Sequence, residues 1–409
     1  MQRLLLAILL TASVLAGCLS GNDDDGSGPV APEAPVATIP AHFSGLEPVP
    51  SPMLNGSEGS FIDGTRLYLS GGEGLRILDI TDPANATVLN AEIEGTQGSS
   101  DVDIMHHPNG RTYAVLNVGG DGHVMLLDVT DPADPVITSE SDLCAHAVAV
   151  VPNTAVVYVS WSLCHLTAIG GTQPLDGDVE ILDFTDPEHP VSSLMVFPPF
   201  VVMGLVPRPI TATSCHEISF NAALKRAYCA GITDTQIWDV AAPLHPAVLS
   251  VIDDPRVNIH HGAWDSRNGT LLVLGDEIAG VLAPIPGCSD DVDLPTSVLW
   301  FYDISDLANP AALGSYAIPH DALESSLESG GIQYCSTHMG EVIDDNRFVI
   351  GWYTAGTAVV DYTDPANAKT LATWRATDSN VWEARYARGH VFLADTGRGL
   401  DILKFVPEA

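Results

Sequence analysis

The sequence predicts an all-β fold, a seven-bladed β-propeller of four-stranded antiparallel blades that is closed by an N-terminal strand. Three observations carry this prediction: a short apolar run recurs, the residues around it alternate like strands, and no stretch keeps a helical period over three turns. The intervals between successive runs are 43 to 64 residues, and periods near 50 are typical of propellers and solenoids. The runs end at Asp79, Asp128, Asp183, Asp239, Asp303, Asp361 and, with the acid replaced, Lys404.

Residues 216–251 show the pattern inside one unit. HEISFN alternates in polarity, AALK forms a turn, and RAYCAGI, TQIWDV and PAVLSVI follow as three more strand-like runs. Short alternating or β-branched runs with turn residues between them indicate strands. Four such strands in each of seven units predict the blades of a propeller.

The segment Leu78–Leu89, LDITDPANATVL, has close copies in later units. In each copy an aspartate can cap its own backbone, and the proline that follows fixes φ at about −65°. We therefore expect this segment to be the hairpin between strands three and four of a blade. Its predicted role is structural.

The run LRILDITDPANATVL, Leu75 to Leu89, closely resembles the repeat of the LVIVD family of β-propellers. The resemblance covers about residues 35–409 and implies the propeller fold, but it implies little about chemistry. The fourth unit departs from the repeat, because Ala241-Ala242-Pro243 stands where the turn should be. The seventh unit lacks the turn entirely.

The last unit ends without a fourth strand, and an open seam would leave an exposed sheet edge. The stretch Ala34–Pro40, APVATIP, is similar to the fourth strands of other units. We expect it to complete blade 7 from the N-terminal side. The alternative is that this stretch belongs to the tether that precedes it.

The N-terminus carries an export signal. Residues 1–18 contain one arginine, a short apolar run and small residues, and Leu15-Ala16-Gly17-Cys18 resembles a lipoprotein lipobox. We expect Cys18 to be lipidated and the chain to be extracytoplasmic, anchored to the cell membrane. The alternative is an ordinary secretory signal. Residues 19–34 are rich in Gly, Pro, Ser and Asp, as expected of a flexible tether, and residues 35–409 form the propeller.

The charge balance restricts the partners of the chain. It has 52 acidic residues against 16 basic ones, a formal net charge of −36, and such a field repels nucleic acid and anionic lipid headgroups. Nucleic-acid binding is therefore excluded. The lysine-poor, aspartate-rich composition is archaeal-like, resembling that of halophilic or marine archaea.

Four histidines occupy equivalent places in four units. Counting back from the second strand of a unit leads to the start of its first strand, where His146, His216, His261 and His338 stand. The same position in the second unit is Asp101. First strands line the central channel of a propeller, so these side chains should converge near one mouth.

Imidazoles and carboxylates that converge are suited to a transition metal, Cu or Zn. If a metal binds, His216, His261 and His338 are the preferred ligands, with His146 as a fourth ligand or a supporting partner. Asp101, Glu217 and Glu341 are candidates to orient the imidazoles or to act as a base. The alternative is structural, since residues at this position can hydrogen-bond the backbone of a neighbouring blade.

Six cysteines follow Cys18, and an even number in an exported chain indicates disulfides. Positions symmetric about the turns between first and second strands predict two pairs, and the remaining two cysteines make the third. The predicted pairs are Cys144–Cys164, Cys215–Cys229 and Cys288–Cys335. The alternative for Cys215 and Cys335 is thiolate ligation of a metal beside the histidines.

These features predict a binding or interaction module at the cell surface. Its expected partners are the lipid membrane, through Cys18, and an unidentified protein or small-molecule ligand, and the chain is expected to be a monomer. The alternative is a metal-dependent oxidoreductase with copper-like chemistry, distantly similar to the methanethiol oxidase (selenium-binding protein) propellers. The sequence leaves open whether the chain is an enzyme and what its substrate is.

Overall fold

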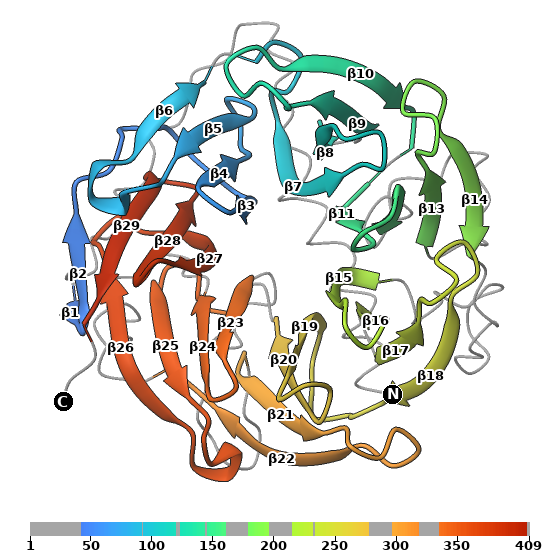
Figure 1. Cartoon of the computed structure of the whole chain (residues 1–409). Helices are drawn as coiled ribbons and strands as arrows, with labels where there is room; N and C mark the ends of the chain where they lie inside the picture. The colour runs from blue at the N-terminus through green and yellow to red at the C-terminus, as the bar shows by residue number, and fades with distance from the viewer. Residues whose placement is uncertain are drawn as a thin grey trace, which may run out of the picture.

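The computed structural model describes residues 42–91, 93–119, 123–143, 145–160, 179–195, 215–231, 234–277, 297–318 and 335–406. The described strands form seven antiparallel sheets arranged as blades around a common axis, as Figure 1 shows. The predicted all-β, seven-bladed propeller is therefore confirmed. Within the described residues, no helix is long and apolar enough to cross a membrane.

In the first three blades the strands follow chain order from the axis outward. Blade 1 contains β3 (Ser60–Asp63), β4 (Arg66–Leu69), β5 (Arg76–Asp79) and β6 (Thr87–Asn90). Blade 2 contains β7 (Ser99–His106), β8 (Thr112–Val118), β9 (His123–Asp128) and β10 (Val136–Ser141). Blade 3 contains β11 (Ala147–Val150), β12 (Val156–Ser160), β13 (Val179–Asp183) and β14 (Val191–Met195).

The next two blades repeat this order. Blade 4 contains β15 (Cys215–Asn221), β16 (Arg226–Gly231), β17 (Thr235–Asp239) and β18 (Ala247–Ile252). Blade 5 contains β19 (His260–Ser266), β20 (Leu271–Asp276), β21 (Leu299–Asp303) and β22 (Ala311–Tyr316).

The last two blades each include an N-terminal strand. Blade 6 contains β23 (Gly340–Asp344), β24 (Arg347–Gly351), β25 (Thr357–Asp361) and β26 (Lys369–Arg375), with β1 (His42–Ser44) added at its outer edge. Blade 7 contains β27 (Val381–Ala387), β28 (His390–Asp395), β29 (Gly399–Phe405) and β2 (Leu46–Val49).

The strand that closes the ring lies further along the chain than the predicted one. β2 pairs with β29 in the register Leu46↔Phe405 to Val49↔Ile402, so closure from the N-terminal side is correct. The predicted Ala34–Pro40 lies outside the described residues, and the fourth strand of blade 7 is Leu46–Val49 instead. The strand has four residues and contains Pro48, which only an outer edge tolerates, so it lacks a clear strand pattern.

The repeated turn has the expected structural role. Oδ1 of Asp79 accepts a hydrogen bond from the backbone N–H of Thr81, and Asp82 caps the 3₁₀ turn η1 (Pro83–Asn85). A second 3₁₀ turn, η4 (Pro365–Asn367), repeats this cap in blade 6. The divergent turn of blade 4 keeps the same bond, from Ala241 N–H to Asp239. The aspartate that ends the third strand is therefore sufficient to hold this turn.

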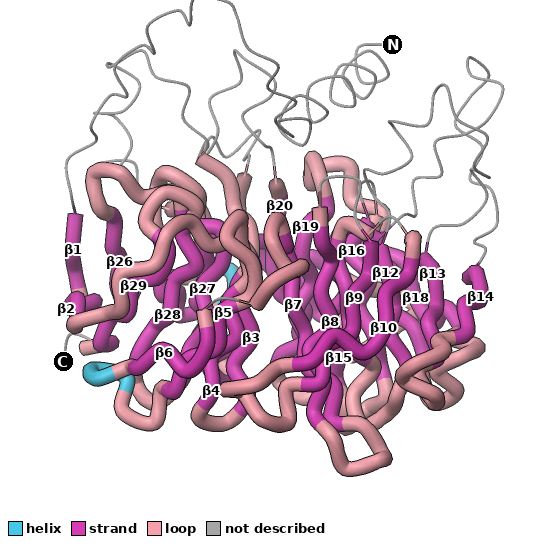
Figure 2. The backbone as a smooth tube through the Cα atoms, turned by 90° about the horizontal axis from the view of Figure 1, so that it is seen from above, coloured by secondary structure: helices cyan, strands magenta, loops and turns pink. Residues whose placement is uncertain are grey.

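The core lies between neighbouring blades, which pack face to face in Figures 1 and 2. The rings of Tyr158 and Trp238 join blades 3 and 4, and the rings of Phe301 and Tyr362 join blades 5 and 6. Each fully buried apolar side chain of this size contributes about 1.5–3 kcal/mol. This packing fixes the innermost strands β3, β7, β11, β15, β19, β23 and β27 around the central channel.

Candidate functional site

The four histidines singled out in the sequence lie against one another in the channel. His216 and His261 are the second residues of β15 and β19, while His146 and His338 come just before β11 and β23. Successive ring centroids are 4.5, 4.4 and 4.3 Å apart, in the order His146, His216, His261 and His338. The innermost strands of blades 3 to 6 therefore bring the histidines together at the ends where those strands begin.

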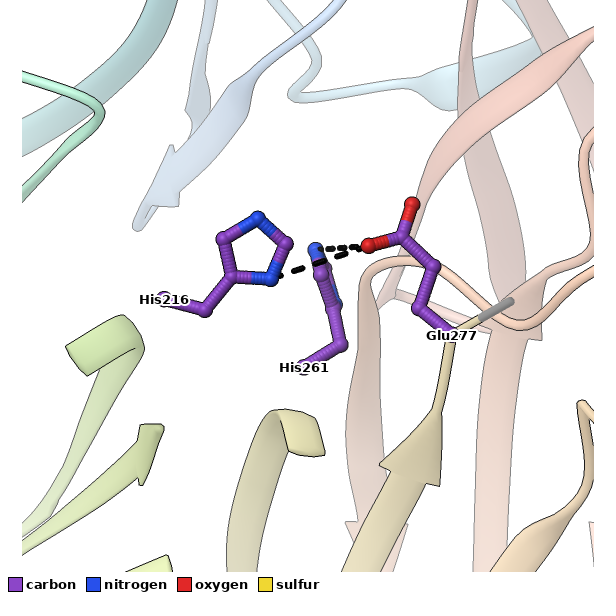
Figure 3. A group of neighbouring side chains, drawn as sticks. All are labelled: His216, His261 and Glu277. Carbon is purple, nitrogen blue, oxygen red and sulfur yellow. Dashed lines mark ion pairs between the residues drawn. The ribbon is translucent and has the colours of Figure 1, made fainter. Parts of the chain in front are cut away.

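The structure adds Glu277, which sequence reasoning missed. Its Oε2 lies 3.6 Å from Nδ1 of His216 and 3.8 Å from Nε2 of His261. One donor atom from each of these three residues lies within 4.8 Å of the other two. Figure 3 shows the carboxylate facing both imidazoles.

Glu277 reaches the histidines because of the antiparallel pairing in blade 5. The end of β20 lies beside the start of β19, with Asp276 opposite His260 in the register. The side chain that follows Asp276 therefore enters the same mouth of the channel as the first residues of the innermost strands. The signal in the sequence is the acidic pair Asp276-Glu277 at the end of a second strand, whereas the predicted site residues lie at or near the start of first strands.

Burial sets the protonation state of the group. His261 is fully buried, and His216 and Glu277 are 8% and 6% exposed. Desolvation lowers the pKa of His216 and of His261 well below the usual value, and the neighbouring histidines lower it further. The imidazoles are therefore neutral at pH 7, which is the form that binds metals. Desolvation also raises the pKa of Glu277 to about 7.

Three nitrogens of His216 and His261 make no hydrogen bond of normal geometry. Within the described part of the chain, Nδ1 and Nε2 of His261 and Nδ1 of His216 have no hydrogen bond. A buried polar atom left without a hydrogen bond costs about 1–3 kcal/mol. Such groups are rare in folded proteins, and they call for an explanation such as an absent ion.

The geometry fits a transition metal. Bonds of about 2.0–2.1 Å in a tetrahedral site place ligand atoms about 3.3–3.4 Å apart. The 3.6 and 3.8 Å separations from Oε2 of Glu277 are close to that value, and the three donor atoms all lie within 4.8 Å of one another. Two imidazoles and one carboxylate suit Zn²⁺ or Cu²⁺, whereas Ca²⁺ and Mg²⁺ require oxygen ligands.

His338 and Tyr353 complete the surroundings. Nδ1–H of His338 donates to the carbonyl of Trp382 at 2.8 Å, and its Nε2 lies 4.0 Å from Oε1 of Glu277. The Tyr353 phenol donates a hydrogen bond to that same oxygen. Desolvation lowers the pKa of His338 to about 3, so this ring is also neutral.

His146 lies at the other end of the row. Its ring stacks on His216 with an angle of 11° between the planes. Desolvation lowers the pKa of His146 to about 4. His146 therefore packs against His216, and it is not one of the three residues whose donor atoms converge.

Two of the three candidate supporting carboxylates bond the backbone of a neighbouring blade. Asp101 accepts a hydrogen bond from Val148 N–H of the next blade, and Glu341 accepts one from Tyr386 N–H, also of the next blade. Both therefore join neighbouring blades, as the structural alternative expected. Glu217 borders a cavity of about 30 Å³ together with Asp101. Desolvation raises the pKa of Glu217 well above the usual value.

One predicted disulfide is present beside the site. Cys215 and Cys229 are bonded across β15 and β16, directly before His216 in the chain. Cys335 is disulfide-bonded as well. Because both are oxidised, neither Cys215 nor Cys335 is a thiolate ligand. Cys18, Cys144, Cys164 and Cys288 lie outside the described residues, so their predicted roles stay predictions.

Comparison with known proteins shows the fold. No protein-family model matches the chain, and no curated protein does. The β-propeller domain of Cps50 (Swd1) from Myceliophteria thermophila is similar, with a TM-score of 0.58 and 10% identity over 87% of this chain and 100% of that domain. The computationally designed Ika8 protein has a TM-score of 0.53 and 11% identity over 88% of this chain and 99% of its own. This chain is thus similar to β-propellers of unrelated sequence.

Proposed function

We propose that this chain is a lipid-anchored, extracytoplasmic binding module that binds one divalent transition metal, Zn²⁺ or Cu²⁺, in its channel. The observation that carries the proposal is the buried group of His216, His261 and Glu277, whose donor atoms lie within 4.8 Å of one another. The unpartnered imidazole nitrogens support it, because a metal would satisfy them. The neutral state of the imidazoles supports it too, since the metal displaces no proton from them.

The anchoring part of the proposal rests on the sequence. Leu15-Ala16-Gly17-Cys18 is the expected lipidation site, and a flexible tether would place the propeller outside the membrane. The Cys215–Cys229 disulfide is in keeping with an oxidising compartment. Fractionation of cells with wild-type chain and Cys18→Ala tests this part. We expect the wild-type chain in the membrane fraction and the variant released, and a wild-type chain without membrane association would contradict it.

Metal binding is tested by elemental analysis and by calorimetric titration of the purified chain with Zn²⁺ and Cu²⁺. We expect one equivalent in the wild-type chain and its loss in His216→Ala and in His261→Ala. His189→Ala is the matched control, because His189 is exposed in a repeat turn and should leave binding unchanged. A wild-type chain that binds no stoichiometric metal would reject the proposal.

A metal-dependent oxidoreductase is the second candidate. The observation that favours it is the position of two oxidisable aromatic rings, Tyr353 and Trp382, 4.9 and 4.3 Å from the ring of His338. The copper-loaded chain would then consume dioxygen in the presence of a small thiol. Consumption equal to that of the His216→Ala variant incubated with the same total copper would count against this candidate.

A further inference from the structure

The outer edge of blade 6 carries an additional strand. β1 pairs with the end of β26 in an antiparallel register that runs from His42↔Arg375 to Ser44↔Thr373. Blade 6 therefore has five described strands, whereas blade 4 has four. Figure 1 shows β1 on the rim of the ring, outside β26. A short strand added to the edge of a blade is thus a contact that this fold already makes.

The edge of blade 4 has the same backbone arrangement. In both blades the fourth strand begins opposite the aspartate that ends the third strand, and a β-bulge follows its second residue. Such a bulge protects an edge from pairing, but β1 pairs with residues that come after the bulge in β26. The three equivalent positions in blade 4 are Val251, Ile252 and Asp253.

A cleft of about 400 Å³ lies at these three positions. It is lined by residues 251–256 and, from blade 5, by Tyr302, Pro310 and Ala312. Val251 is 47% exposed there. Ligand pockets commonly have volumes of about 300–1,000 Å³, so the cleft can take several side chains of an added strand.

The charges in the cleft leave one carboxylate uncompensated. Arg256 donates to Asp254 through its Nε at 2.9 Å and lies 4.8 Å from the centre of the Trp300 ring. The Tyr302 phenol also donates to Asp254, at 2.9 Å. These contacts neutralise Arg256 and hold it in the wall of the cleft. Asp253 is exposed, and within the described part of the chain it belongs to no ion pair.

We propose that the edge of blade 4 at residues 251–253 binds an extended segment of another protein, which adds as a fifth strand and places a lysine or arginine opposite Asp253. Main-chain hydrogen bonds would supply the affinity, and the cleft and this carboxylate the specificity. The partner is a different protein because the net charge of −36 makes copies of this chain repel one another. The surface lies on the rim, so the inference does not depend on the proposed metal.

The first test uses a synthetic peptide of residues 39–46, IPAHFSGL, that carries His42→Lys. In the register that β1 has with Arg375, the lysine would face Asp253. Fluorescence anisotropy of the labelled peptide measures its binding to the purified full chain. We expect it to bind about three- to tenfold more tightly than the His42→Glu peptide, because opposite charges attract across strands and like charges repel. Equal affinities, or no binding of the lysine peptide, would overturn the inference.

A methylated form of the lysine peptide tests whether it binds as a strand. Successive residues of an antiparallel strand alternate between those that bond the neighbouring strand and those that do not. N-methylation of both Phe43 and Ser44 therefore removes a ladder N–H in either register. We expect this peptide to lose at least tenfold in affinity, and unchanged binding would overturn the inference.

The second test locates the site on blade 4. Asp253→Arg should reverse the order of the two peptides, so that the His42→Glu peptide binds more tightly. Asp142→Arg is the matched control, because Asp142 is exposed at the same position of blade 2, where Glu140 stands in place of Val251. The control should keep the wild-type affinities. Equal effects of the two substitutions would attribute binding to the overall negative charge and overturn the inference.

Sedimentation of the purified chain distinguishes a partner protein from a second copy. We expect a monomer at the concentrations used for the peptide titrations. A dimer that Asp253→Arg dissociates would make a second copy the occupant of the cleft and overturn the inference.

Discussion

The phenol oxygen of Tyr353 lies 2.5 Å from Oε1 of Glu277, a bond that joins blade 6 to blade 5 inside the channel. Tyr353 has a φ of +43°, a backbone conformation that costs a non-glycine residue about 1–2 kcal/mol. Two backbone hydrogen bonds with Val381 of blade 7 hold it there. The strain is therefore maintained by the neighbouring blade, and it places the phenol on the carboxylate of the candidate metal site.

Tyr353→Phe should weaken metal binding without removing it. Loss of the phenol frees Oε1, so the carboxylate is no longer held with Oε2 toward His216 and His261. Loss of a hydrogen bond to a ligand costs about 10–100-fold in metal affinity. Competition with a chromophoric Zn²⁺ chelator measures this change.

Tyr362→Phe is the matched control for that substitution. The Tyr362 phenol also makes buried hydrogen bonds, with Ser266 and with the carbonyl of Asp344, but it lies away from the site. It should lose about 1 kcal/mol of stability and keep its Zn²⁺ affinity. Equal affinities in the two variants would show that Tyr353 does not position Glu277.

Glu277→Gln should lower Zn²⁺ affinity by at least 100-fold, because a neutral amide replaces the one anionic ligand. The side chain keeps its size and can still accept the Tyr353 hydrogen bond, so the metal-free chain should melt within a few degrees of the wild type. Glu341→Gln changes another glutamate of the channel, one that bonds the backbone of Tyr386. Calorimetry should give wild-type affinity for that control, and similar losses in both would count against a specific ligand role for Glu277.

The architecture could be predicted because each repeat contains its own turn residues and its own alternating strands, which are visible over a few residues. In blades 1 to 6 the third strand ends at an aspartate whose carboxylate accepts a hydrogen bond from the backbone two residues on, as at Asp79 and Asp361. Radial symmetry then brings equivalent positions of different blades together. His216 and His261 occupy such positions, so their proximity could be predicted from the repeat. The period and the alternation of side chains were sufficient for these conclusions.

The remaining parts of the site depend on contacts that the repeat does not encode. The pairing of β19 with β20 brings Glu277 to the site. A positive φ, which no residue pattern predicts, directs Tyr353 toward it. The roles of Asp101 and Glu341 depend on the backbone of the next blade. The closing strand β2 is too short for its alternation to show.

The stability of the metal-free chain should fall with rising pH because of Glu383. This carboxyl is 2% exposed, and desolvation raises its pKa from 4.5 to about 7, against the opposing effect of Arg385. The native state therefore holds a proton that the unfolded chain has lost between pH 4.5 and 7. Its contribution to stability is present below pH 4.5 and is lost as the pH rises through about 7.

Glu383→Gln, which resembles the protonated acid, should remove that dependence. Between pH 5 and pH 9 the free energy of unfolding of the variant should fall by about 2–3 kcal/mol less than that of the wild type. Urea unfolding at the two pH values measures the difference. The groups that face Glu383 are Arg385, Asp101 and Ser60, and they are unchanged in the variant. Parallel pH profiles for the two chains would contradict the assignment.

Gly45→Ala should destabilise the closed ring. Gly45 lies between β1 and β2, where the chain passes from the edge of blade 6 to the edge of blade 7, and its φ is +68°. A Cβ there would come 2.8 Å from Cβ of Ala372 and 3.1 Å from the carbonyl oxygen of Leu371. The substitution therefore adds a steric clash with blade 6 to the cost of the left-handed conformation.

Gly64→Ala separates these two costs. Gly64 has a φ of +61°, but nothing lies within 4 Å of the Cβ position, so alanine there meets only the conformational cost of about 1–2 kcal/mol. Gly45→Ala should lose about 1–3 kcal/mol more than Gly64→Ala, because overpacking adds to it. Urea midpoints of the two variants measure the difference. Equal losses would mean that the segment around Gly45 can move away from blade 6, and that closure of the ring tolerates such a shift.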